Sequence, residues 1–253
     1  MKKAQAFMVM ILILSLLAGC KKAGEEDDSN SQYKGMTAKD LYTESQTAMS
    51  KGQYTTAIKR LEALESMYPF SDFAEKAQMD LISAYYRKED YPSAAATAER
   101  FIHLYPRASS VDYAYYMKGL SNFQQVRGTF ANILPFDESW RHPGTQTQAY
   151  TDFSTLVQRF PESQYKTNAL QRLIYLRNMF AQRELNTANY YFERKMYVAA
   201  AQRANFLIKN YPQASSAEPA LALLYRINKG MGLSKSAEEN LAVYEASYHK
   251  KLI

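Results

Sequence analysis

A recurring pair of one alanine and one proline constrains the fold of this chain more than any other feature. In four copies the proline stands 12 residues after the alanine and directly follows an aromatic residue. The alanines of the five copies are Ala57, Ala94, Ala149, Ala200 and Ala237, and the prolines of the first four are Pro69, Pro106, Pro161 and Pro212. The alanines lie 37, 55, 51 and 37 residues apart, so a base period of 37 is lengthened twice. A period of this size is typical of solenoid proteins.

The pattern resembles the tetratricopeptide repeat, in which a small residue lets two antiparallel helices approach and a proline ends the second helix. Apolar residues recur at helical spacing in the second helix of a repeat, as in Ile58, Leu61 and Leu64. No segment alternates apolar and polar residues for long, so no sheet is expected. We therefore predict an all-α, tetratricopeptide-like α-solenoid of five helix pairs, at about residues 39–71, 74–108, 111–163, 164–214 and 217–250.

The two extra lengths predict different structures. The 18 extra residues of the third repeat contain Gly128, Pro135, Pro143 and Gly144, so they predict a loop insertion between its two helices, from Gly128 to Thr145. The 14 extra residues of the fourth repeat lie in a stretch with neither glycine nor proline. Fourteen residues make close to four helical turns. This repeat is therefore expected to have an elongated first helix, from about Lys166 to Arg194.

The first 38 residues are expected to lie outside the repeat domain, which is predicted to span residues 39–253. Residues 1–19 combine two lysines with an apolar run that is too short to cross a bilayer, which indicates a signal peptide. It ends in Leu17-Ala18-Gly19-Cys20, which resembles a bacterial lipobox. A lone cysteine can also be a buried apolar filler, but its position after a signal core favours lipidation of Cys20. Residues 20–38, rich in acidic and polar side chains, are expected to form a flexible tether.

The positive charge of the chain is concentrated near its C-terminus. Residues 162–253 carry 13 basic and seven acidic side chains, whereas residues 37–161 carry 13 basic and 14 acidic ones. This imbalance predicts an acidic partner surface for the C-terminal repeats, although a merely solvated helix face would have the same composition. The basic residues are scattered, and the signal peptide with its lipobox predicts export to the periplasm. Nucleic acid is therefore not an expected partner.

The sequence offers no catalytic constellation. His103, His142 and His249 are far apart in the repeat frame, with no acidic or cysteine ligands at metal-binding spacing. Phosphate-binding loops and serine-nucleophile motifs are also absent. We therefore predict a binding protein that is not an enzyme and has no metal site or cofactor.

Positions that line the groove of tetratricopeptide repeats can be carried over onto the N-terminal repeats. They fall on aromatic, methionine and arginine residues, of which the candidates for peptide binding are Tyr42, Met49, Tyr86, Arg87, Tyr113, Tyr116 and Phe123. Such side chains suit an extended apolar or aromatic peptide. The alternative is that many of them are packed between helices. In repeat five the same positions carry no aromatic residue, so the two ends of the domain are expected to bind different partners.

The chain resembles the BamD (ComL) family of outer-membrane lipoproteins from about residue 41 to residue 245. The likeness rests on Tyr68-Pro69-Phe70, Ala84-Tyr85-Tyr86, Tyr116-Met117-Lys118-Gly119-Leu120, Asp152-Phe153-Ser154 and Tyr190-Tyr191-Phe192-Glu193-Arg194. It implies a subunit of the outer-membrane β-barrel assembly machinery whose N-terminal repeats receive unfolded outer-membrane protein precursors. The C-terminal repeats would dock the periplasmic domain of a BamA-like barrel protein, with accessory Bam lipoproteins as further partners. For this docking we expect Arg194, Arg203 and Arg226 to be used.

The resemblance also implies a location. Lys21 follows the lipobox cysteine, where lipoproteins retained in the inner membrane commonly have aspartate, so a lipid anchor in the outer membrane, on its periplasmic face, is expected. Two alternatives remain open at this point. A pilotin-type repeat lipoprotein would escort a secretin, and a cell-wall enzyme or its regulator would require a catalytic domain for which the chain has no room.

Overall fold

The computed structural model describes residues 31–125 and 144–252, and these residues form helices and connecting turns without a strand. The contacts divide the chain into two units, Met1–Thr37 and Ala38–Ile253. In the first unit, Ser31–Tyr33 form one turn of 3-10 helix (η1), where the tether was expected to have no structure. Cys20, the predicted signal peptide and most of the tether lie outside the described residues.

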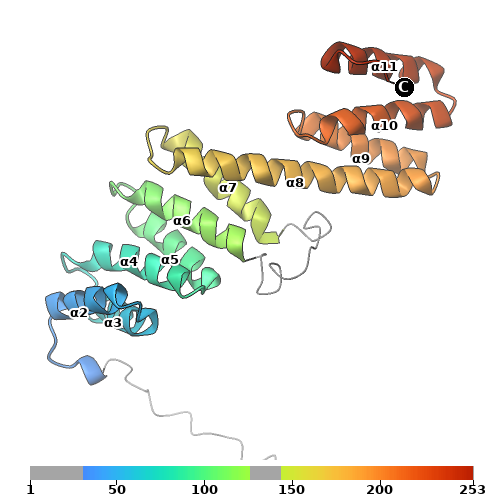
Figure 1. Cartoon of the computed structure of the whole chain (residues 1–253). Helices are drawn as coiled ribbons and strands as arrows, with labels where there is room; N and C mark the ends of the chain where they lie inside the picture. The colour runs from blue at the N-terminus through green and yellow to red at the C-terminus, as the bar shows by residue number, and fades with distance from the viewer. Residues whose placement is uncertain (1–30, 126–143, 253) are drawn as a thin grey trace, which may run out of the picture. The chain divides into compact units, whose positions relative to one another are not determined.

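The second unit confirms the predicted all-α solenoid of five helix pairs (Figure 1). Each helix packs against the next along the chain. The pairs are α2 (Ala38–Ser50) with α3 (Tyr54–Met67), α4 (Ala74–Arg87) with α5 (Tyr91–Leu104), α6 (Val111–Gln124) with α7 (Gly144–Arg159), α8 (Lys166–Glu193) with α9 (Tyr197–Asn210), and α10 (Ala217–Gly230) with α11 (Ser234–Tyr248). The insertion was predicted to reach Thr145, but α7 already begins at Gly144. The rest of the insertion lies outside the described residues.

The repeated alanines and aromatic-proline pairs have the local roles that their spacing predicts. Ala57, Ala94, Ala149 and Ala200 are fully buried, and Ala237 is buried as well, because each second helix approaches its neighbours closely at this position. The aromatic residue before each proline ends the second helix, and its backbone N–H donates to the carbonyl four residues earlier, as Tyr68 does to Leu64 at 2.8 Å. The proline that follows cannot continue the helix.

The turn inside a repeat has a fixed backbone conformation in four of the five copies. Gly52, Glu89, Lys195 and Gly232 each stand five residues before the repeated alanine, and each has a positive φ, between 59° and 73°. Glycine adopts this conformation without strain, whereas a residue with a side chain does so at a cost. Glu89 and Lys195 therefore stand at positions where glycine would be the more stable choice.

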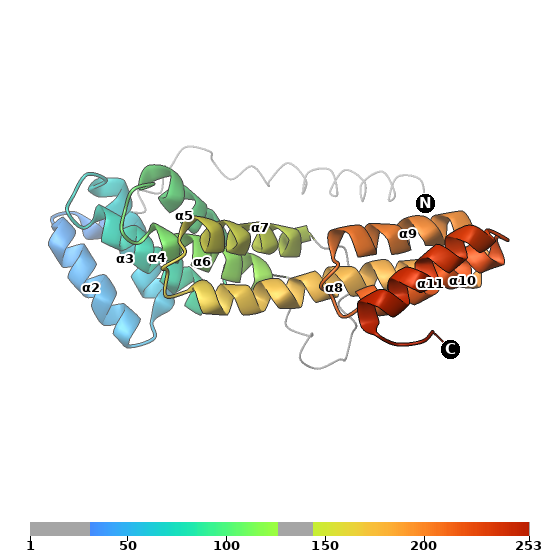
Figure 2. The same cartoon turned by 90° about the horizontal axis from the view of Figure 1, so that it is seen from above.

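The elongated helix α8 belongs to two hydrophobic cores. Its first half places Ala169 and Leu176 in a core with α5, α6 and α7, whose largest fully buried side chains are Phe101 and Phe153. Its second half contributes Ala181, Leu185 and Ala188 to a second core with α9 and α10. Both views show α8 running past α7 at one end and past α9 and α10 at the other (Figures 1 and 2). The extra helical turns therefore give one helix a place in both cores.

Candidate functional site

The first helices of repeats one and two are joined by a polar and aromatic contact at predicted groove positions. The Tyr42 hydroxyl on α2 donates to Asp80 Oδ2 on α4 at 3.0 Å, and Gln46 Nε2 donates to the same oxygen at 2.7 Å. The Tyr42 ring also packs on Phe73, with a centroid distance of 5.2 Å. Burial, reinforced by the nearby Asp80 carboxylate, raises the pKa of Tyr42 to about 12. The half-buried Tyr42 is therefore a neutral side chain that also stabilises the packing.

The first helices of repeats three and four are joined in a similar way. The ring of Tyr116 on α6 stacks on Tyr165, with a centroid distance of 4.6 Å and an angle of 16°. The Tyr116 hydroxyl donates to Asn168 Oδ1 on α8 at 3.0 Å. Tyr113, one turn earlier on α6, also contacts Tyr165, at 5.8 Å. Burial raises the pKa of both Tyr113 and Tyr116, so both remain uncharged at physiological pH.

Two residues of this surface, Phe73 and Tyr165, were not among the predicted positions. Each stands four residues after the repeated proline, directly before a first helix, and packs on a tyrosine of the preceding first helix. The same position carries Ser110 and Ser216 in repeats three and five, where the serine hydroxyl is hydrogen-bonded instead. The residue four places after each proline was thus a readable signal in the sequence.

An open cavity of about 530 Å³ lies between α4 and α6, at the centre of the predicted groove. Three predicted residues, Tyr86, Arg87 and Tyr113, line it together with Ser83, Glu89, Tyr91 and Met117. Tyr86 meets Tyr91 edge to face at 5.4 Å, whereas Arg87 is exposed. The structure therefore brings aromatic walls and a cation into one open site. Met49, half-buried near the end of α2, does not line this cavity.

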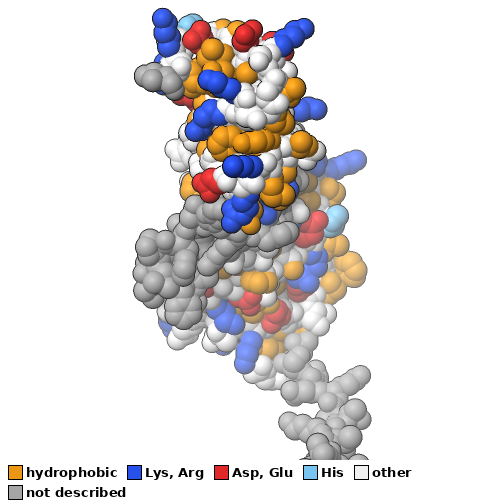
Figure 3. Space-filling view, turned by 90° about the vertical axis from the view of Figure 1, so that its right-hand side faces the viewer, with side chains coloured by type: hydrophobic (Ala, Val, Ile, Leu, Met, Phe, Trp, Pro, Cys, Tyr) orange, Lys and Arg blue, Asp and Glu red, His pale blue; other side chains and the backbone are white. Residues whose placement is uncertain are grey.

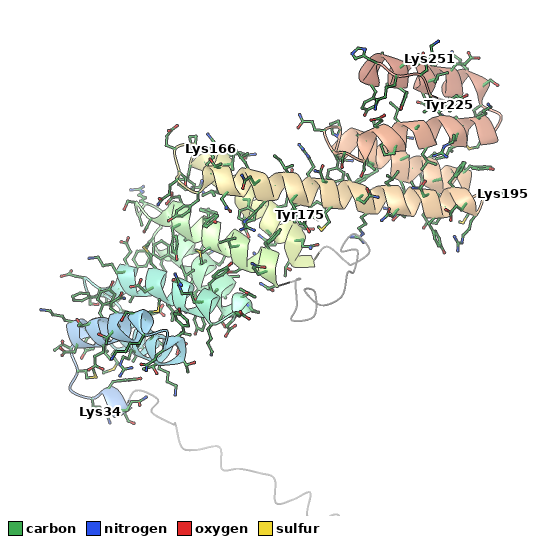
Figure 4. The ribbon with its side chains drawn as sticks, in the orientation of Figure 1. Lys34, Lys166, Tyr175, Lys195, Tyr225 and Lys251 are labelled. Carbon is green, nitrogen blue, oxygen red and sulfur yellow. The ribbon has the colours of Figure 1, made fainter. Side chains whose placement is uncertain are left out.

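A smaller cavity of about 310 Å³ lies between the end of α6 and the first half of α8, where Figure 4 labels Tyr175. It is lined by Phe123, Asn168, Gln171, Arg172 and Tyr175. Of the two alternatives given for the groove candidates, Phe123 follows the second and is packed between helices, because only 7% of it is exposed. The Tyr175 ring covers it edge-on at 5.7 Å, and the Arg172 guanidinium lies 5.0 Å from the ring centroid.

The three arginines predicted for partner docking are exposed, and each is held by a different residue of α8. Arg194 follows α8 directly and lies over the Tyr190 ring, 3.7 Å from its centroid. Arg226 lies 5.7 Å from the Phe192 ring, and Arg203 Nη1 is 3.2 Å from Glu184 Oε2. Arg203 is thus already paired with a carboxylate. Among the described residues, neither Arg194 nor Arg226 has a carboxylate within ion-pair distance.

The most buried charged cluster joins α5, α6 and α7. Lys118 Nζ on α6 contacts the Glu99 carboxylate of α5 and lies 3.1 Å from Asp152 Oδ1 on α7. Asp152 is 3% exposed and also accepts hydrogen bonds from Asn122 and Gln148, at 2.8 and 3.0 Å. Burial alone would lower the pKa of Lys118, but the two carboxylates outweigh it and raise the pKa. These groups are mutually satisfied and line neither groove cavity, so the cluster has a structural role.

The described part of the chain holds no group of three or more histidine, cysteine, aspartate or glutamate side chains that could bind a metal ion. Among the same residues, no helix is both long and apolar enough to cross a membrane.

Comparison with known proteins identifies the family. The sequence profile of the YfiO family, described as outer membrane lipoprotein, matches residues 34–243. The chain is 37% identical over 230 residues to the outer membrane protein assembly factor BamD of Vibrio cholerae, covering 90% of this chain and 92% of that protein. BamD of Xylella fastidiosa is 35% identical over 85% of this chain and 72% of its own length. BamD of Neisseria meningitidis is 33% identical over 95% of this chain and 91% of its own length.

A more distant structural neighbour is a tetratricopeptide repeat protein of Parabacteroides merdae. It covers 81% of this chain and 77% of its own length at 14% identity, with a TM-score of 0.37, which carries no information on function. The relatives are named as outer membrane protein assembly factors, a name that describes no enzymatic activity, in agreement with the prediction that this chain is not an enzyme. Both the matching profile and these relatives cover most of the sequence, so the chain belongs to the YfiO (BamD) family of outer membrane lipoproteins.

Proposed function

We propose that this chain is a non-catalytic, lipid-anchored subunit of the outer-membrane β-barrel assembly machinery, as the names of its relatives suggest. The observation that carries the proposal is the aromatic surface formed by consecutive first helices, on a chain of this family. An open, mostly uncharged aromatic surface suits the binding of unfolded polypeptide better than it suits chemistry on a small substrate.

The N-terminal groove binds unfolded barrel precursors. The cavity between α4 and α6 provides aromatic walls from Tyr86, Tyr91 and Tyr113 and a cation from Arg87. An aromatic side chain of a precursor would pack against the rings, and Arg87 would attract a nearby carboxylate. Replacing Tyr86 with alanine removes one wall, and loss of such an anchor costs about 2 kcal/mol or more. Precursor binding by Tyr86→Ala is therefore expected to weaken, whereas Leu104→Ala, at an exposed apolar residue outside the cavity, should bind normally.

The C-terminal repeats dock the periplasmic domain of a BamA-like barrel protein, and accessory Bam lipoproteins are further candidate partners. The excess of basic side chains after residue 162 supports an acidic partner surface. Arg194 and Arg226 are exposed and available for pairing, whereas Arg203 would first have to leave Glu184. We therefore rank Arg194 and Arg226 above Arg203 as docking residues.

The anchor of the chain is a lipidated Cys20, inserted in the outer membrane from the periplasmic face. The family description and the lipobox support this proposal. The Cys20→Ala chain is expected to incorporate no labelled palmitate and to leave the outer-membrane fraction. Retention of Cys20→Ala in that fraction, without its partners, would contradict the proposed anchor.

The experiment that tests the whole proposal is a pull-down of the tagged chain from detergent-solubilised outer membranes, with mass spectrometry of the co-purifying proteins. The expected result is a roughly equimolar barrel protein with periplasmic repeat domains. Recovery of a secretin instead would support the pilotin-type alternative. Recovery of no stable partner would contradict the docking proposal.

A further inference from the structure

The turn between α4 and α5 carries two charged side chains in the wall of the aromatic cavity. Arg87 is the last residue of α4, and Glu89 stands two residues later in the turn. Both line the cavity of about 530 Å³, and both are exposed. Among the described residues, neither has an oppositely charged side chain within ion-pair distance. One cation and one anion are therefore both available to a bound segment.

The backbone holds Glu89 in a conformation that a residue with a side chain adopts only at a cost. Its φ is 65°, at the point where α4 ends. The Glu89 N–H donates to the Tyr86 carbonyl at 3.0 Å, and the Asp90 N–H donates to the Tyr85 carbonyl at 2.9 Å. This pair of bonds is a Schellman motif, in which glycine is the usual residue, as it is in repeats one and five. A strained residue in the wall of a binding site indicates a role for its side chain.

The two charges lie near different tyrosines of the cavity. Burial raises the pKa of Tyr91, at the start of α5, and the nearby Glu89 carboxylate raises it further. Burial also raises the pKa of Tyr113 on α6, whereas the nearby Arg87 cation opposes the rise. The Asp80 carboxylate acts on Tyr113 as well, but it already accepts two hydrogen bonds from α2. The cavity therefore has an unpaired anion on the side of Tyr91 and an unpaired cation on the side of Tyr113.

Charged side chains elsewhere on the molecule are interspersed. Figure 3 shows lysine and arginine side chains scattered among acidic and hydrophobic ones on one face. Exposed charges act over about one Debye length, roughly 8 Å at physiological salt. At the turn itself, Asp90 accepts from the Ser93 N–H, and Lys88 is exposed and does not line the cavity. The charge preference of the cavity should therefore depend mainly on Arg87 and Glu89.

We propose that Glu89 determines which precursor segments enter the groove, because it rejects an acidic residue on one side of the bound aromatic residue. The inference rests on the proposed binding of precursors and adds selectivity to it. Arg87 accepts an acidic neighbour on the other side, and Glu89 favours a basic or hydrogen-bond-donating neighbour on its own side. The occupant is an extended segment in which an aromatic residue stands between residues of unlike charge. Segments with acidic residues on both sides are disfavoured.

The test measures the affinity of the full-length chain in detergent for peptides with blocked ends and a central aromatic pair in a background of serine and glycine. The acidic peptide has glutamate on both sides of the pair, and the mixed peptides have glutamate on one side and lysine on the other, in either order. The parent chain should prefer the better mixed peptide over the acidic one by about twofold to fivefold, the range of an exposed charge pair.

The variants show whether this preference comes from Glu89. Glu89→Gln keeps the size of the side chain and should reduce the preference to near one. Glu89→Gly should also lose the preference while melting at or above the temperature of the parent, which a purely structural role for Glu89 would not produce. Lys88→Gln, at the neighbouring exposed residue outside the cavity, is the matched control and should keep the preference.

The outcomes separate this inference from the proposed function. If Glu89→Gln binds the peptides with the same preference as the parent, precursor binding stands and the role of Glu89 is overturned. If Lys88→Gln loses the preference as fully as Glu89→Gln does, the preference is not specific to the cavity and the inference is wrong. If the parent binds none of the peptides, or if Tyr86→Ala binds them as tightly as the parent does, the proposed groove site fails and the inference fails with it.

Discussion

The first three repeats and the last two use the same helix pair to build different surfaces. In the first three, groove residues are joined across neighbouring first helices, as Tyr42 is to Asp80 and Tyr116 is to Asn168. In the last two, Met196 and Val198 are exposed at the turn after α8, beside Arg194 and Lys195, for which the described residues offer no carboxylate within ion-pair distance. The groove is therefore a surface whose residues also stabilise the fold, whereas the side chains of Met196 and Val198 at the turn are largely outside the hydrophobic cores. Substitutions in the groove of the first three repeats should accordingly lower both stability and binding. Substitutions at the turn after α8 should change binding without a matching loss of stability.

The largest expected effect tests whether the two regions fold as one. Met179 lies on α8 between Leu176 of the first core and Ala181 of the second. Proline at position 179 removes a backbone hydrogen bond of α8 and clashes with the preceding helical turn. The free energy of unfolding of Met179→Pro should therefore fall by at least about 3 kcal/mol. Calorimetry should show two transitions where the unchanged chain shows one. A single transition in Met179→Pro would mean that α8 does not couple the cores, and Met179→Leu serves as the near-neutral control.

The next effect concerns the buried charges of repeats two and three. Lys118→Met leaves Asp152 buried without its cation, and loss of one partner of a buried pair costs about 3 to 5 kcal/mol. We expect the lower end of this range, because Asn122 and Gln148 still donate to Asp152. Urea denaturation measures the loss, and the double variant Lys118→Met with Asp152→Leu should recover part of it. A Lys118→Met chain as stable as the parent would show that the cluster contributes no stability.

A smaller effect is expected at the closest helix contact of repeat three. A Cβ added to Gly119 would lie 2.7 Å from the fully buried ring of Phe153. Overpacking of this kind costs about 1 to 3 kcal/mol, which exceeds the helix-forming advantage of alanine. Gly119→Ala should therefore lower the melting temperature. Gly230→Ala, where the neighbour is the more accessible Tyr197, should lower it less, and the opposite order would contradict the described packing.

The helix pairs could be predicted from the sequence because their signals are local. The buried alanines and the helix-ending prolines repeat at fixed spacing, and the absence of glycine and proline gave the length of α8 to within one residue. The sequence left open whether Phe123 is exposed or packed, because the Tyr175 and Arg172 that cover it come from a lengthened helix without a counterpart in the other repeats. The exposed apolar side chains of Met196 and Val198, at the turn after α8, were missed because the carried-over positions cover first helices and not turns.

At the turn, stability and binding are expected to change in opposite directions. Lys195→Gly relieves the strained backbone, so the free energy of unfolding should be unchanged or rise by up to about 1 kcal/mol. The same substitution removes a cation next to Arg194, a proposed docking residue, and should weaken binding of the periplasmic domain of the barrel protein. A matched change, Glu89→Gly, should relieve strain without affecting that binding. If Lys195→Gly binds the domain as strongly as the parent chain does, Lys195 does not contribute to docking.

The smallest effect is a dependence of stability on pH. The hydrogen bond from Lys118 lowers the pKa of Glu99 below its ordinary value of 4.5, although burial opposes the shift. The stability from Glu99 is therefore present above pH 4.5 and is lost as the pH falls through the lower, folded pKa. The melting temperatures of the parent chain and Glu99→Gln should differ at pH 7 and converge on acidification. A difference that grows as the pH falls would reverse the sign of the proposed linkage.

The account depends most on the separation of two binding surfaces on one solenoid. The most direct measurement is the affinity of three full-length chains, the parent, Tyr86→Ala and Arg194→Ala, for two ligands. The ligands are the periplasmic domain of the barrel protein and a precursor peptide that ends in an aromatic residue. We predict that Tyr86→Ala weakens only binding of the peptide and that Arg194→Ala weakens only binding of the domain. If either folded variant weakens both ligands equally, or if neither variant weakens any, the assignment of separate surfaces is contradicted.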